Sequence, residues 1–169
     1  TVLDRLAATF GVAAVSVFIV EDSTYNAALV PAGANYSLLV TSALMRDFEL
    51  IELEGVVAHC LARHRLGLLT RQAVAAVATL NDENRAVLAG PGTAYRADEV
   101  AAAAIRYPLG LAAALRRCEA QRVASDSFFA TGSYRAGRWV WFDQWSDRGT
   151  HDLGDLDDVQ VRAMAREEW

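Results

Sequence analysis

The segment that most constrains this chain is residues 54–64, which read Glu-Gly-Val-Val-Ala-His-Cys-Leu-Ala-Arg-His. We predict that it lies within one helix spanning residues 49–65. On a helix, residues four apart face the same side, so His59 and Arg63 share a face. A single histidine in an apolar helix is more often a core or surface residue than a ligand, so this segment alone leaves the function open.

The same segment has the frame of the HExxH motif of zinc proteases. In that motif two histidines one helical turn apart bind Zn²⁺, and the glutamate is the general base. Here the frame reads His59-Cys60-Leu61-Ala62-Arg63. The first histidine is present, but Cys60 stands at the position of the base and Arg63 at that of the second histidine.

Other motifs follow in an order known from one family. They are residues 25–29 (Tyr-Asn-Ala-Ala-Leu), 36–41 (Tyr-Ser-Leu-Leu-Val-Thr), 42–45 (Ser-Ala-Leu-Met), 52–59 (Glu-Leu-Glu-Gly-Val-Val-Ala-His), 94–98 (Ala-Tyr-Arg-Ala-Asp) and 107–115 (Tyr-Pro-Leu-Gly-Leu-Ala-Ala-Ala-Leu). Most of the chain thus resembles the HtpX-like and CAAX-prenyl-endopeptidase family, metallopeptidase family forty-eight. The resemblance implies an α+β, zincin-like (gluzincin) domain, with a small sheet packed on an active-site helix and further helices.

The resemblance also implies which residues held the metal. The family's third zinc ligand is a glutamate at the position of Ala94, and its supporting aspartate remains as Asp98. A catalytic zinc usually takes three ligands from protein, and here only His59 is left. Arg63 is always charged and would repel a cation. We therefore predict a catalytically inactive domain, a pseudopeptidase, with no bound cofactor, although zinc is the cofactor of the family.

Two hypotheses follow for Arg63. In the first, its guanidinium pairs with Asp98 and replaces the charge of the metal, since a partly buried carboxylate needs a cation or donors. In the second, Arg63 extends outward into solvent as an ordinary cation on the helix surface.

Two rescue hypotheses keep a catalytic site. Cys60 and His64 are four residues apart and could form a shifted metal site, the basis of an alternative function as a residual zinc-dependent endopeptidase. Further ligands for it would be Asp98, Glu99 or Cys118. Cys60 could instead be a nucleophile activated by His59 or His64. The plainer interpretation makes Cys60 a small buried apolar side chain.

A protease that has lost its metal can keep its substrate edge. The matching strand covers Tyr36, Ser37, Leu38, Leu39, Val40 and Thr41, so we predict that an unknown protein or peptide binds there by strand addition. A third reading is a merely structural domain. It predicts that bulky side chains fill the cleft.

Composition sets the remaining limits. The 169 residues predict one domain, residues 1–169, and the net charge of -5 gives no basis for nucleic-acid binding. No apolar stretch is long enough to span a membrane, so we expect a cytoplasmic location, and a membrane anchor upstream of Thr1 stays open. Two cysteines form no disulfide framework.

Periodicity and turn residues give the expected elements. Strands are predicted at 15–20 and 25–30, joined as a hairpin through residues 21–24, and at 36–41. Helices are predicted at 3–10, 49–65, 66–80, 92–106, 108–122 and 156–167. A last hairpin is predicted from 127–131 and 138–142. His151 loosely matches a late family element, and Trp139, Trp141 and Trp145 are interpreted as core rather than as a ligand platform.

Overall fold

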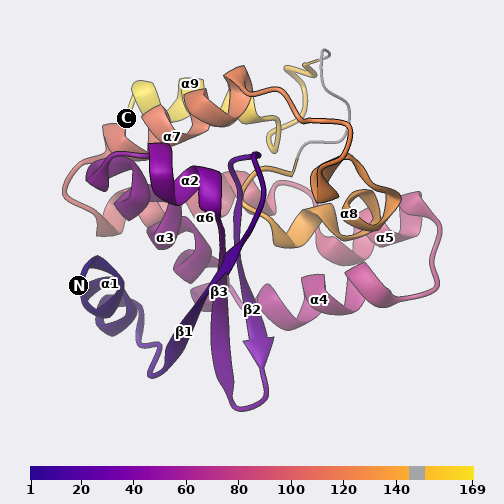
Figure 1. Cartoon of the computed structure of the whole chain (residues 1–169), viewed down its shortest axis with the longest axis horizontal. Coiled ribbons are helices and arrows are strands. Elements are labelled where there is room, and N and C mark those ends of the chain that lie inside the picture. Colours follow the sequence, from indigo (N-terminus) through magenta and orange to yellow (C-terminus); the bar gives the residue numbers. More distant parts are fainter. Residues whose placement is uncertain (145–150) are drawn as a thin grey trace.

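The computed structural model describes residues 1–144 and 151–169. It shows an α+β structure built around a three-stranded sheet (Figure 1). The strands are β1 (Val15–Val20), β2 (Ala27–Ala32) and β3 (Asn35–Thr41), in the order β1-β3-β2. The helices are α1 (Val2–Phe10), α2 (Ser42–Asp47), α3 (Leu50–Arg65), α4 (Leu69–Val77), α5 (Asp82–Ala89), α6 (Thr93–Ala104), α7 (Pro108–Ala120), α8 (Gly132–Gly137) and α9 (Val159–Glu167). Two 3-10 turns, η1 (Phe128–Ala130) and η2 (Arg138–Val140), flank α8.

The predicted hairpin of the first two strands is wrong. β2 forms its hairpin with β3 through a turn in which Gly33 has a φ of 63°, and β1 pairs with β3 in parallel. The polar residues after β1 explain the difference, because they bind elsewhere instead of closing a tight turn. The carboxylate of Asp22 accepts hydrogen bonds from the Ser127 hydroxyl at 2.9 Å and from the Phe128 N–H at 3.3 Å, both far away in the sequence. β3 is thereby left free to lie between the other two strands.

This strand order overturns the predicted peptide-binding edge. Residues Tyr36 to Thr41 belong to β3, the central strand, and are paired with β1 on one side and with residues of β2 on the other. A strand whose N–H and C=O groups are used on both sides has none left for an added peptide. β3 is therefore not a docking edge.

The C-terminal third also differs from the prediction. In place of a hairpin from 127–131 and 138–142 the chain forms η1, α8 and η2, because the Thr131 hydroxyl accepts the Tyr134 N–H at 3.3 Å and starts a helix. The predicted helix 66–80 is shorter, as α4, and the polar stretch after it begins α5. Trp139 and Trp141 are buried, which confirms them as core, while Trp145 lies outside the described residues.

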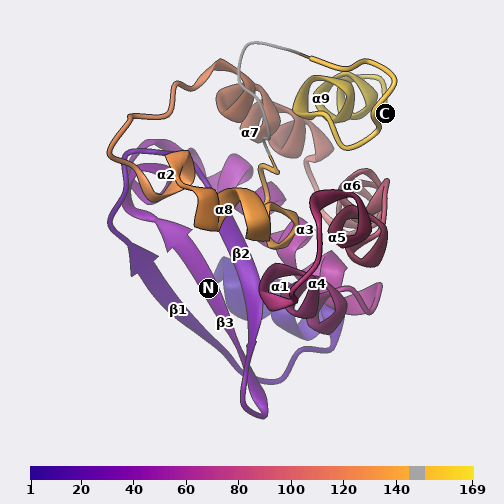
Figure 2. The ribbon, with the colours of Figure 1, turned by 90° about the vertical axis from the view of Figure 1, so that its right-hand side faces the viewer.

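Two apolar layers enclose the sheet. Leu29, Leu38 and Val40 pack on the larger core with residues of α1, α3, α6 and α7. On the opposite face Ala28 packs against Phe129 and Trp141, and Figure 2 shows α8 over that face. No helix among residues 1–144 and 151–169 is long and apolar enough to cross a membrane.

The contact between α3 and α7 depends on two glycines. A Cβ added at Gly55 would lie 2.7 Å from the Leu111 Cα, and one added at Gly110 would overlap the Ile51 carbonyl group. Backbone is in the way at both places, so neither helix can adjust by a rotamer change. The two helices therefore approach closely only because these positions lack a side chain.

We predict that Gly110→Ala lowers the free energy of unfolding by about 1–3 kcal/mol, although alanine favours helix more than glycine does. Urea titration followed by circular dichroism measures this change. Gly132→Ala in α8 is the matched control, because a Cβ there meets nothing within 4 Å and the stability should stay the same or rise slightly. Equal losses in both variants would contradict the close helix contact.

Candidate functional site

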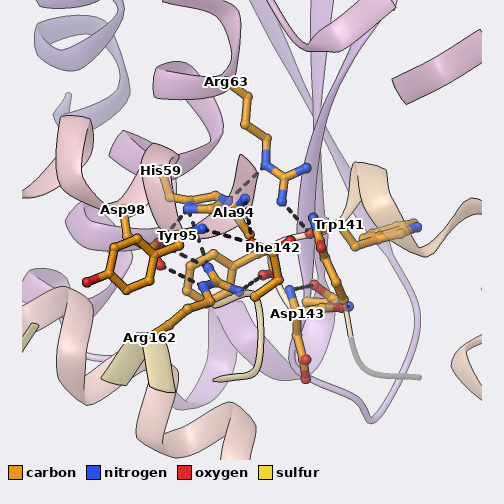
Figure 3. Close-up of polar contacts among 12 residues, drawn as sticks. His59, Arg63, Ala94, Tyr95, Asp98, Trp141, Phe142, Asp143 and Arg162 are labelled. Carbon is orange, nitrogen blue, oxygen red and sulfur yellow. Dashed lines mark hydrogen bonds and ion pairs between the residues drawn. The ribbon is translucent and has the colours of Figure 1, made fainter. Parts of the chain in front are cut away.

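His59 lies in the interior where α3 packs on α6. Its Nδ1 is 2.7 Å from Oδ1 of Asp98 on α6, and both residues are fully buried. Figure 3 shows the two side chains pointing toward one another. Asp98 therefore orients the ring of His59.

Arg63 occupies the other side of the same ring. Its Nε donates to Nε2 of His59 at 2.9 Å, a contact between residues one turn apart on α3. His59 must then carry its proton on Nδ1, where it donates to Asp98, and accept on Nε2. Burial lowers the pKa of His59 to about 3, so the ring is neutral at neutral pH.

Asp98 pairs with Arg162, not with Arg63. Arg162 reaches in from α9, and its Nε and Nη2 donate to the two carboxylate oxygens at 2.6 and 3.0 Å. Burial alone would raise the pKa of Asp98, but the charge of Arg162 and the contact with His59 hold it well below its usual range. The predicted Arg63–Asp98 pair is therefore wrong, because a second, unforeseen arginine is already there.

The alternative for Arg63 is also wrong, because its side chain is only 1% exposed. Beyond His59 it donates to Oε1 of Gln72 at 3.0 Å, to the Trp141 carbonyl at 2.8 Å and to the Trp139 carbonyl. Burial lowers the pKa of Arg63 to about 10, which still leaves it charged at neutral pH. We call His59, Arg63, Asp98 and Arg162 the buried network.

The segment 139–143 covers this network. Two of its carbonyls accept from Arg63, and the Phe142 carbonyl accepts from Nη1 of Arg162 at 2.7 Å. The ring of Phe142, fully buried, meets the His59 ring edge-on at 5.0 Å. Asn26 holds the end of the segment, since its side chain bonds the Asp143 N–H at 2.9 Å and the Asp143 carbonyl at 3.0 Å. The space beside His59 is thus filled by protein.

Ala94 lies at the start of α6, one turn before Asp98, and is fully buried. The carboxylate of Asp157 accepts the N–H groups of Gly92, Ala94 and Tyr95 at 2.9, 3.1 and 3.2 Å. A negative charge at a helix N-terminus is stabilising. The backbone at position 94 is therefore held firmly, but its side chain offers no ligand.

These residues do not fit a zinc ion. A metal would need the Nε2 lone pair of His59, but that lone pair already accepts a hydrogen bond from the Arg63 guanidinium. Arg63 and Ala94 supply no further metal ligand. Within residues 1–144 and 151–169, no group of three or more His, Cys, Asp or Glu side chains could hold a metal. No catalytic step through zinc follows from this arrangement.

The rescue hypotheses find no support in the geometry. Cys60 is 1% exposed within the core, and burial raises the pKa of its thiol to about 12, so a thiolate nucleophile is disfavoured. Its interpretation as a small buried apolar side chain is confirmed. The His64 ring lies edge-on to Tyr36 at 4.9 Å, Cys118 is buried near the Tyr25 carbonyl, and Glu99 is exposed.

His151 takes no part in the buried network. It lies near the surface before α9, where its Nδ1 is 3.1 Å from the Asp158 carboxylate. Asp158 in turn caps α9 by accepting the Gln160 N–H at 2.8 Å. The histidine therefore supports a helix start.

Arg162 is not among the residues predicted from the sequence, although a signal for it exists. In α9 the positions 159, 162, 163 and 166 form one helical stripe, and Arg162, Ala163 and Arg166 are all buried. Arginine within the stripe of a helix that also carries alanine and valine indicates a buried cation in need of a partner. No sequence pattern indicated that carbonyls of segment 139–143 would accept hydrogen bonds from buried arginines.

Comparison with known protein families, with curated proteins and with solved structures finds no match to this chain. The family resemblance therefore rests on the motifs alone, and the geometry of the site has to carry any functional conclusion.

The neutral, buried His59 predicts a specific pH dependence. Its folded pKa of about 3 lies below the ordinary 6.5, so protonation favours the unfolded chain and stability falls as the pH drops below 6.5. The slope from this group is about 1.4 kcal/mol per pH unit. Unfolding titrations from about pH 6 to about pH 5, above the range in which Asp98 contributes, should show this slope in wild type and a smaller slope in His59→Gln. An unchanged slope in His59→Gln would contradict the assignment.

The pairing of Asp98 with Arg162 predicts a second pattern. Arg162→Met leaves the carboxylate buried without its cation and should cost about 3–5 kcal/mol of unfolding free energy. Adding Asp98→Leu should recover most of that loss, because no charge is then left unpaired. Arg116→Met, which breaks the more exposed pair with Glu167 between α7 and α9, should cost less than about 1 kcal/mol. A double variant no more stable than Arg162→Met would argue against the direct pair.

Proposed function

We propose that this chain is a catalytically inactive metallopeptidase-like domain, a pseudopeptidase, which acts through protein contacts rather than by hydrolysis. The observation that carries the proposal is the 2.9 Å contact between Arg63 Nε and His59 Nε2. In the zinc-protease frame that nitrogen faces the metal. Here a fixed cation faces it instead, and it comes from the position of the second histidine.

The electrostatics supports this proposal. A buried histidine that gives Nδ1–H to a carboxylate is the arrangement that orients a metal ligand, so half of such a site persists in His59 and Asp98. A guanidinium can supply the positive charge of a metal, but it cannot polarise a water or accept a proton. Both ring nitrogens of His59 are occupied, so no general base remains at this place.

The filled interior favours a structural role for the former site. Arg63, Phe142 and Arg162 occupy the space beside His59, which is what the closed-cleft reading predicts. What remains available for function is the outer surface, and we infer that a partner is bound there. The alternative, a residual zinc-dependent endopeptidase, would need Cys60 and His64 to face a common point with a third ligand.

We predict that the frame can be turned back into a metal site. In Arg63→His with Ala94→Glu, the new histidine lies one turn from His59, and the new carboxylate lies one turn before Asp98 on the face that meets the ring. The double variant should bind one zinc per chain and gain thermal stability when zinc is added. Mass spectrometry of bound metal and melting curves with and without zinc measure both effects.

The matched control is Arg65→His with Ala94→Glu, because Arg65 is exposed on the same helix and should yield no zinc site. Wild type should keep no zinc after dialysis and should cleave no casein. A tightly held zinc in wild type would contradict the proposal. So would a folded double variant that binds no more zinc than its control.

A further inference from the structure

β1 is an edge strand whose outer side no other strand covers in the described part of the chain. The opposite edge, on β2, is protected. There the Phe142 N–H donates to the Ala27 carbonyl at 2.7 Å, Ala28 bridges Trp141, and Pro31 lacks an N–H. Figure 2 shows β1 at the left margin of the molecule, beyond β3. The sheet thus has one covered edge and one open edge.

The hydrogen bonds fix which groups of β1 point outward. The Ala14 carbonyl accepts from the Tyr36 N–H at 3.3 Å, so it faces β3. Backbone groups alternate along a strand, so those of Ser16 and Phe18 also face β3, while those of Val17 and Ile19 point away from the sheet. These two residues carry the donors and acceptors that an added strand would meet.

The side chains along this edge are apolar and exposed. Val17 and Ile19, on the face of Leu38 and Val40, are 48% and 49% exposed, and Phe18, on the other face, is 56% exposed. The strand Val-Ser-Val-Phe-Ile-Val has no charge, proline or glycine. Edge strands usually carry charged residues or proline, which prevent pairing with another chain. Because β1 lacks both, its outer edge can pair with another strand.

We propose that β1 pairs with β1 of a second copy of this chain, antiparallel, about a twofold axis at Phe18. Phe18 then lies opposite Phe18 of the second copy on one face, and Val17 lies opposite Ile19 of the second copy on the other. The outward backbone groups of Val17 and Ile19 bond each other across the axis. The two sheets become one sheet of six strands.

The composition of the strand selects this occupant and this register. Every exposed apolar side chain meets an apolar partner, whereas an axis at Val17 would place Phe18 opposite Ser16. The nearest charge, Glu21, lies opposite Val15, so no like charges face each other. The three side chains offer only a few hundred Å² per chain, so the dimer is concentration-dependent rather than obligate.

This inference goes beyond the proposed function and uses no residue of the buried network. A wild-type chain that held zinc would overturn the pseudopeptidase proposal and leave the pairing of β1 untouched. A chain that stays monomeric would overturn the pairing of β1 and leave the pseudopeptidase proposal untouched.

Sedimentation of the wild-type chain over a wide concentration range tests the pairing. A reversible monomer–dimer equilibrium is expected, and Phe18→Lys should raise its dissociation constant at least about tenfold, because two like charges then lie opposite each other. Val77→Lys, on an 84% exposed position of α4, is the control and should dimerise as wild type does. A monomer at all concentrations, or equal weakening by both substitutions, overturns the proposal.

Cross-linking tests the register. The Phe18 positions form a non-hydrogen-bonded pair with Cα atoms about 4.5 Å apart, within the range of a disulfide. Oxidised Phe18→Cys should therefore form a covalent dimer, while Val17→Cys should form one only when mixed with Ile19→Cys. Cys60 and Cys118 are buried and leave this readout clear. Efficient self-linking of Val17→Cys, or none at position 18, would overturn the axis at Phe18.

Discussion

The hydrogen bond from Arg63 to His59 is the contact on which the rest of this interior depends. It fixes the proton of His59 on Nδ1, and that proton in turn bonds Asp98 at 2.7 Å. Asp98 then needs a cation on its other side, which Arg162 supplies. The arginine at position 63 is thus tied, through two further residues, to the packing of α9 on α6.

The buried network also decides the path of segment 139–143. Removing two guanidinium groups from water is costly unless their N–H groups are satisfied. The carbonyls of segment 139–143 satisfy several of them, so the segment crosses the site instead of forming the second strand of a hairpin. Burying the arginines and closing the site are therefore the same event. The result is a core that contains charged side chains.

Local patterns predicted part of this structure and long-range contacts decided the rest. Helix α3 and the common face of His59 and Arg63 follow from sequence spacing, and the burial of Cys60 follows from the apolar character of a free cysteine. The position of β3 did not, because the polar residues around Asp22 read as a turn but bind Ser127, more than one hundred residues away. Arg162 was missed for a similar reason, since its partner Asp98 lies on another helix. A residue whose partner lies far away in the sequence is therefore only weakly indicated by the residues next to it.

The central claim concerns the state of one imidazole ring, and nitrogen NMR of His59 measures it most directly. A neutral ring protonated on Nδ1 should be seen at neutral pH, with no titration until the pH is far below 6.5 and no change on addition of zinc. A ring that titrates near pH 6.5, or whose Nε2 signal shifts on binding zinc, would show that Arg63 does not occupy Nε2 of His59.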